Sequence, residues 1–243
     1  MSVIDGAGRK SRIRLQDFVR RKSDLVRQPT PPYYLRDSDK LYVAATVDPD
    51  LVRPWLPPGV TLAPSNTAIL SVYTIEDGPF GPYSGAVLGV AVTGHDSIDG
   101  MEGVFWIGGY VSENGAYLQR DYESAHEAGR GRIWREGDVV LGEATRTDGT
   151  GAVRFRVRLN GNSEALYDGA YNYLGNDGEG GARIFSLIGY ARDALYGQLE
   201  AFEIAEDASP AIQALKPVSL SWGIHLWHIN MIFGAPHRLA HAD

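Results

Sequence analysis

Short runs of apolar residues, bounded by Gly, Pro, Asn or Asp, recur along most of the chain. Runs of this length and spacing are typical of β-strands rather than helices. The pattern predicts strands over residues 41–47, 68–75, 86–93, 104–111, 138–145, 153–159, 184–190, 198–204 and 218–233. The last run is long enough to require a bulge or a bend. We therefore expect a protein made mainly of strands.

Helix signals are few. Asp48-Pro49 places an N-cap residue before a proline at the first helical position, and this predicts a helix that ends at Pro57-Pro58-Gly59. Two more short helices are predicted over about 122–129 and about 209–215. Many strands with few helices favour an α+β protein, mainly antiparallel β, whose sheet closes or folds over on itself.

Charge is distributed unevenly over the 243 residues. The formal net charge is −7, yet residues 1–30 hold eight Lys or Arg and three Asp, a net +5 that leaves −12 for the rest. The spacing of apolar residues predicts an amphipathic helix over about 15–26, and a proline-rich stretch separates this basic arm from one domain over residues 31–243. We expect the arm to dock on the acidic body across a subunit boundary of a homo-oligomer; the alternative is binding to a membrane surface or another partner.

The composition excludes several kinds of chemistry. The chain has no cysteine, which excludes thiol nucleophiles, CxxC redox pairs, zinc ribbons and iron–sulfur ligation. Its acidic balance argues against a nucleic-acid partner. The most apolar stretch, residues 218–235, contains His225, His228 and Asn230, which argues against a membrane span. No signal-peptide pattern opens the chain, so we expect a cytoplasmic protein.

Motifs for metals, phosphates and nucleophilic serines are weak. The glycine-rich stretch Gly175–Arg183 lacks the lysine and the spacing of a phosphate loop, and it predicts a surface turn. His225 and His228 lie three apart in a predicted strand, so their side chains point to opposite faces and cannot share a metal ion. No serine lies in a GxSxG elbow. The sequence therefore predicts a small-molecule site that uses neither a metal nor a cofactor.

Two groups of residues remain as candidates for a site. The first is an aromatic series spread over consecutive predicted strands: Tyr73, Phe80, Tyr83, Trp106 and Tyr110. Such a series forms either an ordinary core or the wall of a pocket, because buried tyrosine hydroxyls need partners. The second is the charged stretch 127–146, which is either a solvated connection or part of a site.

The run Tyr33–Pro58 resembles the N-terminal strand and helix of the acetoacetate decarboxylase family. A Gly-Arg helix end at Gly129-Arg130 and a following strand that closes with Leu141-Gly142-Glu143 fit the same family. The last third of the chain fits as well, through Ala211–Pro217 and the final long strand. The resemblance implies a cone-like, closed and mostly antiparallel sheet around an internal cavity, in a homo-oligomer.

The resemblance also implies a departure in chemistry. In that family a lysine forms a Schiff base with the substrate ketone, and a second lysine beside it lowers its pKa, an effect for which the family is the standard example. Here both positions correspond to valines, Val139 and Val140. The chain has four lysines, Lys10, Lys22, Lys40 and Lys216, and we expect neither Lys40, at the start of a strand, nor Lys216, before a proline, to face the pocket. A Schiff base is therefore not expected.

The other family positions depart too. The substrate-binding arginine corresponds to a position near Ser38, and the two pocket carboxylates correspond to positions near Leu70 and Gly85. The candidate acid, base or anion-binding residues that remain nearby are Glu76, Glu136, Arg36 and Arg135. The candidate substrate-binding residues are Tyr73, Tyr83, Trp106, Tyr110 and Val139.

These residues predict a cofactor-free lyase or isomerase for a small aromatic or enolisable carbonyl substrate. It would act by acid/base catalysis without a Schiff base, with loss of formaldehyde, CO2 or water. Two alternatives stay open because a fold alone does not determine a function. They are a non-catalytic small-molecule-binding protein of the same fold, and a structural subunit that assembles with an active relative.

Overall fold

The computed structural model describes residues 2–4, 10–12, 30–122, 124–160, 165–176 and 179–239. The strands are β1 (Ser2–Ile4), β2 (Lys10–Arg12), β3 (Tyr33–Val47), β4 (Thr67–Asp77), β5 (Tyr83–Val92), β6 (Gly103–Val111), β7 (His126–Glu136), β8 (Val139–Arg146), β9 (Gly151–Leu159), β10 (Ala165–Asn176), β11 (Ala182–Ile204), β12 (Pro217–Phe233) and β13 (His237–Arg238). The helices are α2 (Pro49–Val52), η1 (Arg53–Trp55), η2 (Glu113–Gly115), α3 (Tyr117–Tyr122) and α4 (Pro210–Gln213).

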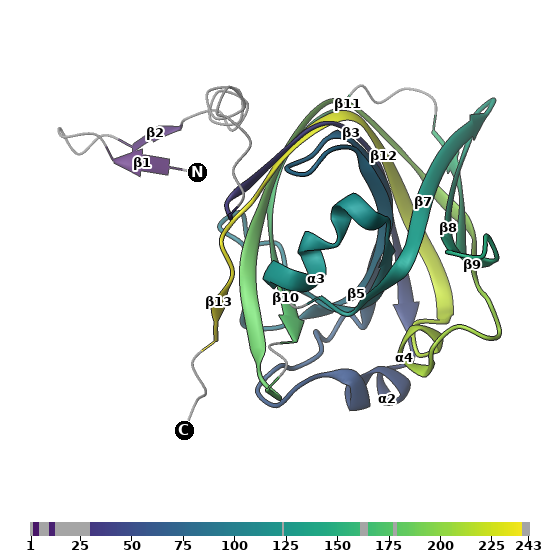
Figure 1. The fold of residues 1–243 in the computed structure, drawn as a ribbon, viewed down its shortest axis with the longest axis horizontal. Coiled ribbons are helices and arrows are strands. Elements are labelled where there is room, and N and C mark those ends of the chain that lie inside the picture. The colour runs from purple at the N-terminus through teal and green to yellow at the C-terminus, as the bar shows by residue number, and fades with distance from the viewer. Residues whose placement is uncertain are drawn as a thin grey trace.

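The large sheet closes on itself. Its strand order is β10-β11-β12-β3-β4-β5-β6-β7-β8-β9, and each end strand also pairs with a strand inside this order, β10 with β6 and β9 with β11 (Figure 1). The pairings of β6 with β7 and with β10 are parallel, whereas the other neighbours in this order pair antiparallel. The expected closed, mainly antiparallel sheet is therefore confirmed.

Side chains on the two faces of the strands form two large cores. Leu41, Val43 and Phe155 belong to the first core, in which aliphatic residues dominate. The second core is rich in aromatic residues and includes Trp106 and Phe185, whose ring centroids lie 4.8 Å apart. Helix α3 lies inside the ring of strands and adds its own buried side chains to the second core (Figure 1).

A bulge in β3 changes which residues face the second core. Leu35 and Tyr42 both belong to that core, although strict alternation along a strand would place them on opposite faces. Between them Asp37 has a φ of 47°, and the pairing of β3 with β12 shifts register on both sides of Ser38. His228, which hydrogen-bonds to Asp37, has a φ of 46°. The bulge thus lets Leu35 face the same core as the later part of β3, whose register with β4 is unbroken from Arg36 to Thr46.

Most predicted elements are present, and the exceptions have physical causes. The predicted strands 184–190 and 198–204 are two halves of the single strand β11, and the predicted helix near 209–215 is α4. The helix predicted over 122–129 is wrong, and so is the assignment of Gly129-Arg130 to a helix end, because residues 126–136 form β7. The cause is the pairing of β7 with β8, which runs from Gly129 to Glu136. Gly131 also permits close packing, since an added Cβ there would lie 2.2 Å from the carbonyl oxygen of Gly85.

The basic arm is described only in part. Residues 2–4 and 10–12 pair as a separate two-stranded sheet, and the predicted helix over 15–26 lies outside the described residues. Among the helices that the structure describes, none has both the length and the apolar character to cross a membrane. Within the same part of the chain, no three His, Asp or Glu side chains gather in a way that would hold a metal ion.

Candidate functional site

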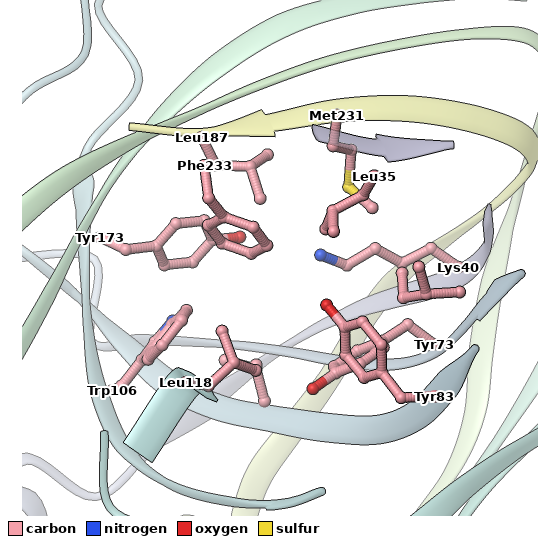
Figure 2. Close-up of a pocket in the computed structure, with 12 residues that line it drawn as sticks. Leu35, Lys40, Tyr73, Tyr83, Trp106, Leu118, Tyr173, Leu187, Met231 and Phe233 are labelled. Carbon is pink, nitrogen blue, oxygen red and sulfur yellow. The ribbon is translucent and has the colours of Figure 1, made fainter. Parts of the chain in front are cut away.

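A narrow cavity lies within the aromatic-rich second core. Its walls come from β3, β4, β5, β6, β10, β11, β12 and α3, and they consist of Leu35, Lys40, Tyr73, Ile75, Tyr83, Val87, Trp106, Leu118, Tyr173, Leu187, Met231 and Phe233 (Figure 2). Only about 10 Å³ between these side chains has room for the centre of a water molecule. That is room for about one water. A larger ligand must therefore displace side chains, for which the flexible Met231 is suited.

Lys40 brings an amine into this apolar cavity. The side chain is 4% exposed, and Figure 2 shows it extended across the pocket with its nitrogen toward the centre. Its Nζ lies 4.3 Å from the ring centroid of Tyr42 and 5.7 Å from that of Tyr73. Among the described residues no carboxylate pairs with it. Burial disfavours the charged form and lowers the pKa of Lys40 to about 7, so a large fraction of the amine is neutral near pH 7.

Three tyrosines line the cavity with Lys40, and their hydroxyls differ in their partners. The Tyr83 hydroxyl lies 2.5 Å from that of Tyr117, and the Tyr173 hydroxyl lies 3.3 Å from that of Tyr42. The Tyr73 hydroxyl is buried and has no hydrogen-bond partner among the described residues. Burial raises the pKa of all three cavity tyrosines, so each phenol keeps its proton at neutral pH and can donate it.

A buried histidine backs the aromatic wall. His126 on β7 packs edge-on against Trp106, with ring centroids 5.4 Å apart. Burial lowers the pKa of His126 to about 4, so its imidazole is neutral at physiological pH. His126 therefore adds no charge next to the cavity.

The aromatic candidates divide between the two cores. Tyr73, Tyr83 and Trp106 line the cavity. Tyr110 belongs to the first core instead, and Val139 is buried on β8 outside the cavity wall. Phe80, the fifth aromatic residue of the series, is 39% exposed. Three of the aromatic residues are thus brought together with Lys40.

The charged candidates lie outside the cavity, and the expectation that Glu76 or Glu136 faces it is wrong. Glu76 follows the inward-facing Ile75 on β4, so alternation along the strand turns it to solvent. Glu136 is exposed and accepts a hydrogen bond from the indole of Trp134, 3.0 Å away. Arg36 lies 3.8 Å from Asp77 in a half-exposed pair. The exposed Arg135 donates to the Gly137 carbonyl over 2.6 Å.

The expectation that Lys40 lies outside the pocket is also wrong. It rested on a strand that begins at Leu41, whereas β3 begins at Tyr33 and carries the bulge at Asp37 ahead of Lys40. One signal in the sequence could have identified Lys40. The run 41–47 is apolar on both faces, which is typical of a strand buried on both sides, so a lysine directly before it is a candidate for a buried functional amine.

Comparisons with known proteins identify the fold of this chain. No family model matches this sequence, and no curated protein matches it by sequence. Solved structures of the acetoacetate decarboxylase fold do match over most of the chain, and the expected resemblance is thereby confirmed at the level of fold.

Three particular structures illustrate the match. An acetoacetate decarboxylase superposes with a TM-score of 0.68 at 13% identity, covering 87% of this chain and 90% of its own. The enduracididine biosynthesis enzyme MppR, complexed with pyruvate, gives 0.66 at 15% identity over 90% and 94%. An acetoacetate decarboxylase-like enzyme from Sphingomonas wittichii RW1 gives 0.62 at 16% identity over 86% and 93%. At these identities the likeness establishes the fold and leaves the activity to be argued from the cavity.

Proposed function

We propose that this chain is a cofactor-free lyase that binds a small aromatic or enolisable carbonyl compound in the cavity and forms an imine with it through Lys40. One observation carries the proposal: the Lys40 amine is buried among apolar and phenolic side chains, and its pKa is lowered to about 7. A buried lysine without a counter-ion costs stability. Such a cost is typical of functional sites, where a neutral amine is needed as a nucleophile.

The chemistry follows from the neutral amine. Its nitrogen attacks the carbonyl carbon, and one water leaves as the imine forms. The protonated imine withdraws electrons from a neighbouring C–C or C–H bond, so the fragment lost can be an aldehyde, CO2 or water, and the product is released by hydrolysis. A neutral phenol beside the amine donates the protons that these steps need. The fold relatives support this proposal, since MppR has also been solved with a condensation product of pyruvate and an aldehyde.

This proposal replaces acid/base catalysis by Glu76 or Glu136, which both face solvent. The expectation of chemistry without a Schiff base depended on a cavity free of lysine, and Lys40 removes that premise. A non-catalytic binding protein remains the second candidate, because a cavity lined almost wholly by apolar and aromatic side chains can hold a small ligand without reacting with it. The two candidates differ in whether the amine reacts.

Reductive trapping tests the proposal. The protein is incubated with acetone or benzaldehyde and sodium cyanoborohydride, and intact mass is measured over time from pH 5 to 9. We expect one adduct per chain, mapped by peptide digestion to Lys40, with a trapping rate that rises through about pH 7 as the amine loses its proton.

Two variants serve as controls. Lys40→Met should abolish the adduct, whereas Lys216→Met should leave it unchanged, because Lys216 is exposed. If wild type gives no adduct on Lys40 with either carbonyl compound, the imine proposal is wrong and the binding-protein candidate gains support.

A further inference from the structure

The cavity has no second charged group. Lys40 is the one charged side chain among its lining residues, within the part of the chain that the structure describes. Two arginines next to lining residues on the same elements have partners elsewhere: Arg36 on β3 pairs with Asp77, and Arg120 on α3 pairs with Asp121. A carboxylate bound in this cavity would therefore find a single counter-ion, the amine itself.

If the Lys40 amine serves as the counter-ion of a carboxylate, it cannot also react with a carbonyl group. A carboxylate stabilises the protonated form of a nearby amine, and an ammonium group has no lone pair with which to attack a carbonyl. The carboxylate must also give up its hydration on entering an apolar cavity, which is unfavourable for a buried ion even when it is paired. An uncharged carbonyl compound avoids both penalties, because it leaves the amine of Lys40 neutral and unpaired.

The Tyr73 hydroxyl is available to donate a hydrogen bond to the oxygen of an uncharged carbonyl compound. Tyr73 on β4 is the direct cross-strand neighbour of Lys40 on β3. Its hydroxyl is buried without a partner, whereas those of Tyr83 and Tyr173 lie within 3.3 Å of another tyrosine hydroxyl. A buried donor without a partner is costly, and a ligand oxygen next to Lys40 would satisfy it.

We infer that the cavity selects uncharged aldehydes or ketones with a flat apolar substituent, and that Tyr73 binds their carbonyl oxygen while Lys40 attacks the carbon. The inference rests on the proposed imine chemistry and narrows its substrate class. In the balanced step, the amine and the carbonyl form a carbinolamine, Tyr73 donates a proton to its hydroxyl group, and water leaves as the C=N bond forms. The amine proton released in this step restores the phenol.

Matched pairs of compounds test the charge selection. Benzaldehyde is compared with 4-carboxybenzaldehyde, and methyl acetoacetate with acetoacetate, in reductive trapping of the wild-type protein at pH 7.5. Each rate is divided by the rate for free Nα-acetyl-lysine, which removes the intrinsic reactivity of the compound. We expect the uncharged member of each pair to be trapped on Lys40 at least about tenfold faster, a ratio that corresponds to about 1.4 kcal/mol.

Tyr73→Phe and Tyr110→Phe form the matched pair of variants. Both remove one buried hydroxyl and keep the ring, but Tyr110 belongs to the first core and does not line the cavity. We expect Tyr73→Phe to slow trapping of the uncharged compounds about 10²-fold, with the midpoint of the pH profile unchanged, and Tyr110→Phe to leave the trapping rate unchanged.

The outcomes separate the inference from the proposed function. Equal or faster trapping of the acids on Lys40 would contradict the charge selection while leaving the imine chemistry intact. An equal effect of the two tyrosine variants would contradict the role of Tyr73. If neither member of either pair forms an adduct on Lys40, the imine chemistry is wrong and the inference falls with it.

Discussion

Replacing Lys40 with methionine is expected to stabilise the protein by about 3 to 5 kcal/mol at pH 6. The lysine is 4% exposed and has no counter-ion among the described residues, and burial lowers its pKa from 10.5 to about 7. Each unit of that difference corresponds to about 1.4 kcal/mol of differential interaction between the protonated and neutral forms. Methionine keeps the length and removes the charge. The Lys40→Met variant is therefore expected to be more stable and unable to form an imine.

The gain from Lys40→Met should depend on pH in a defined direction. Below about pH 7 both the folded and unfolded wild-type chains hold the proton, so the folded state carries the full burial cost. Between pH 7 and 10.5 only the unfolded chain holds it, and wild-type stability rises with pH relative to the variant. Urea unfolding of both proteins at pH 6, 8 and 10 should therefore show a shrinking difference.

The control for this prediction is Lys216→Met at an exposed position. Its free energy of unfolding should change by no more than about 0.5 kcal/mol at each pH. A gain for Lys40→Met that stays constant from pH 6 to 10, or a loss of stability, would mean that Lys40 is not held as a buried, uncompensated amine.

Gly131→Ala is expected to destabilise the protein by about 3 kcal/mol or more. An added Cβ at Gly131 on β7 would lie 2.2 Å from the carbonyl oxygen of Gly85, and 2.9 and 3.0 Å from its carbonyl carbon and nitrogen. These are backbone atoms of β5, so no side-chain rotation relieves the clash. The amide of Gly131 also donates to the Ser84 hydroxyl over 3.2 Å, and a displaced β7 would lose this bond.

Gly151→Ala is the matched control. Gly151 opens β9, and an added Cβ would meet only the Glu143 carboxylate at 3.4 Å, an ordinary contact. Its stability should stay within about 0.5 kcal/mol of wild type in the same urea titration. Equal stabilities for the two variants would show that β5 and β7 separate easily. The close packing at Gly131 would then contribute nothing to the free energy of unfolding.

The sequence predicts the fold well because strand signals depend on local periodicity. Runs such as 68–75 and 104–111 carry enough β-branched and aromatic residues to identify β4 and β6 directly. Strand β7 escapes this reasoning, since glycine and arginine dominate its sequence, and its strand conformation comes from pairing with β8 rather than from its own residues.

The site is harder to predict because it depends on strand parity. Tyr73, Tyr83 and Trp106 are visible as an aromatic series, but the series alone does not separate them from Tyr110 in the other core. Lys40 points inward with Tyr42, two residues further along β3, and it pairs with Tyr73 on β4, but the predicted strand begins one residue after Lys40. The sequence therefore points to charged residues near the predicted pocket rather than to the lysine within it.

The bulge at Asp37 also bears on how such a fold can change its binding cavity. Deleting one residue there would turn residues 33–36 of β3 relative to the rest of the strand, whose register with β4 holds Lys40 in place. Leu35 would then leave the cavity wall with no cavity residue mutated. Substitution is thus not the sole evolutionary route by which the space beside the amine is enlarged or filled. Comparing relatives by insertions and deletions in this strand, and not by aligned residues alone, would sort those with the same cavity wall from those with another.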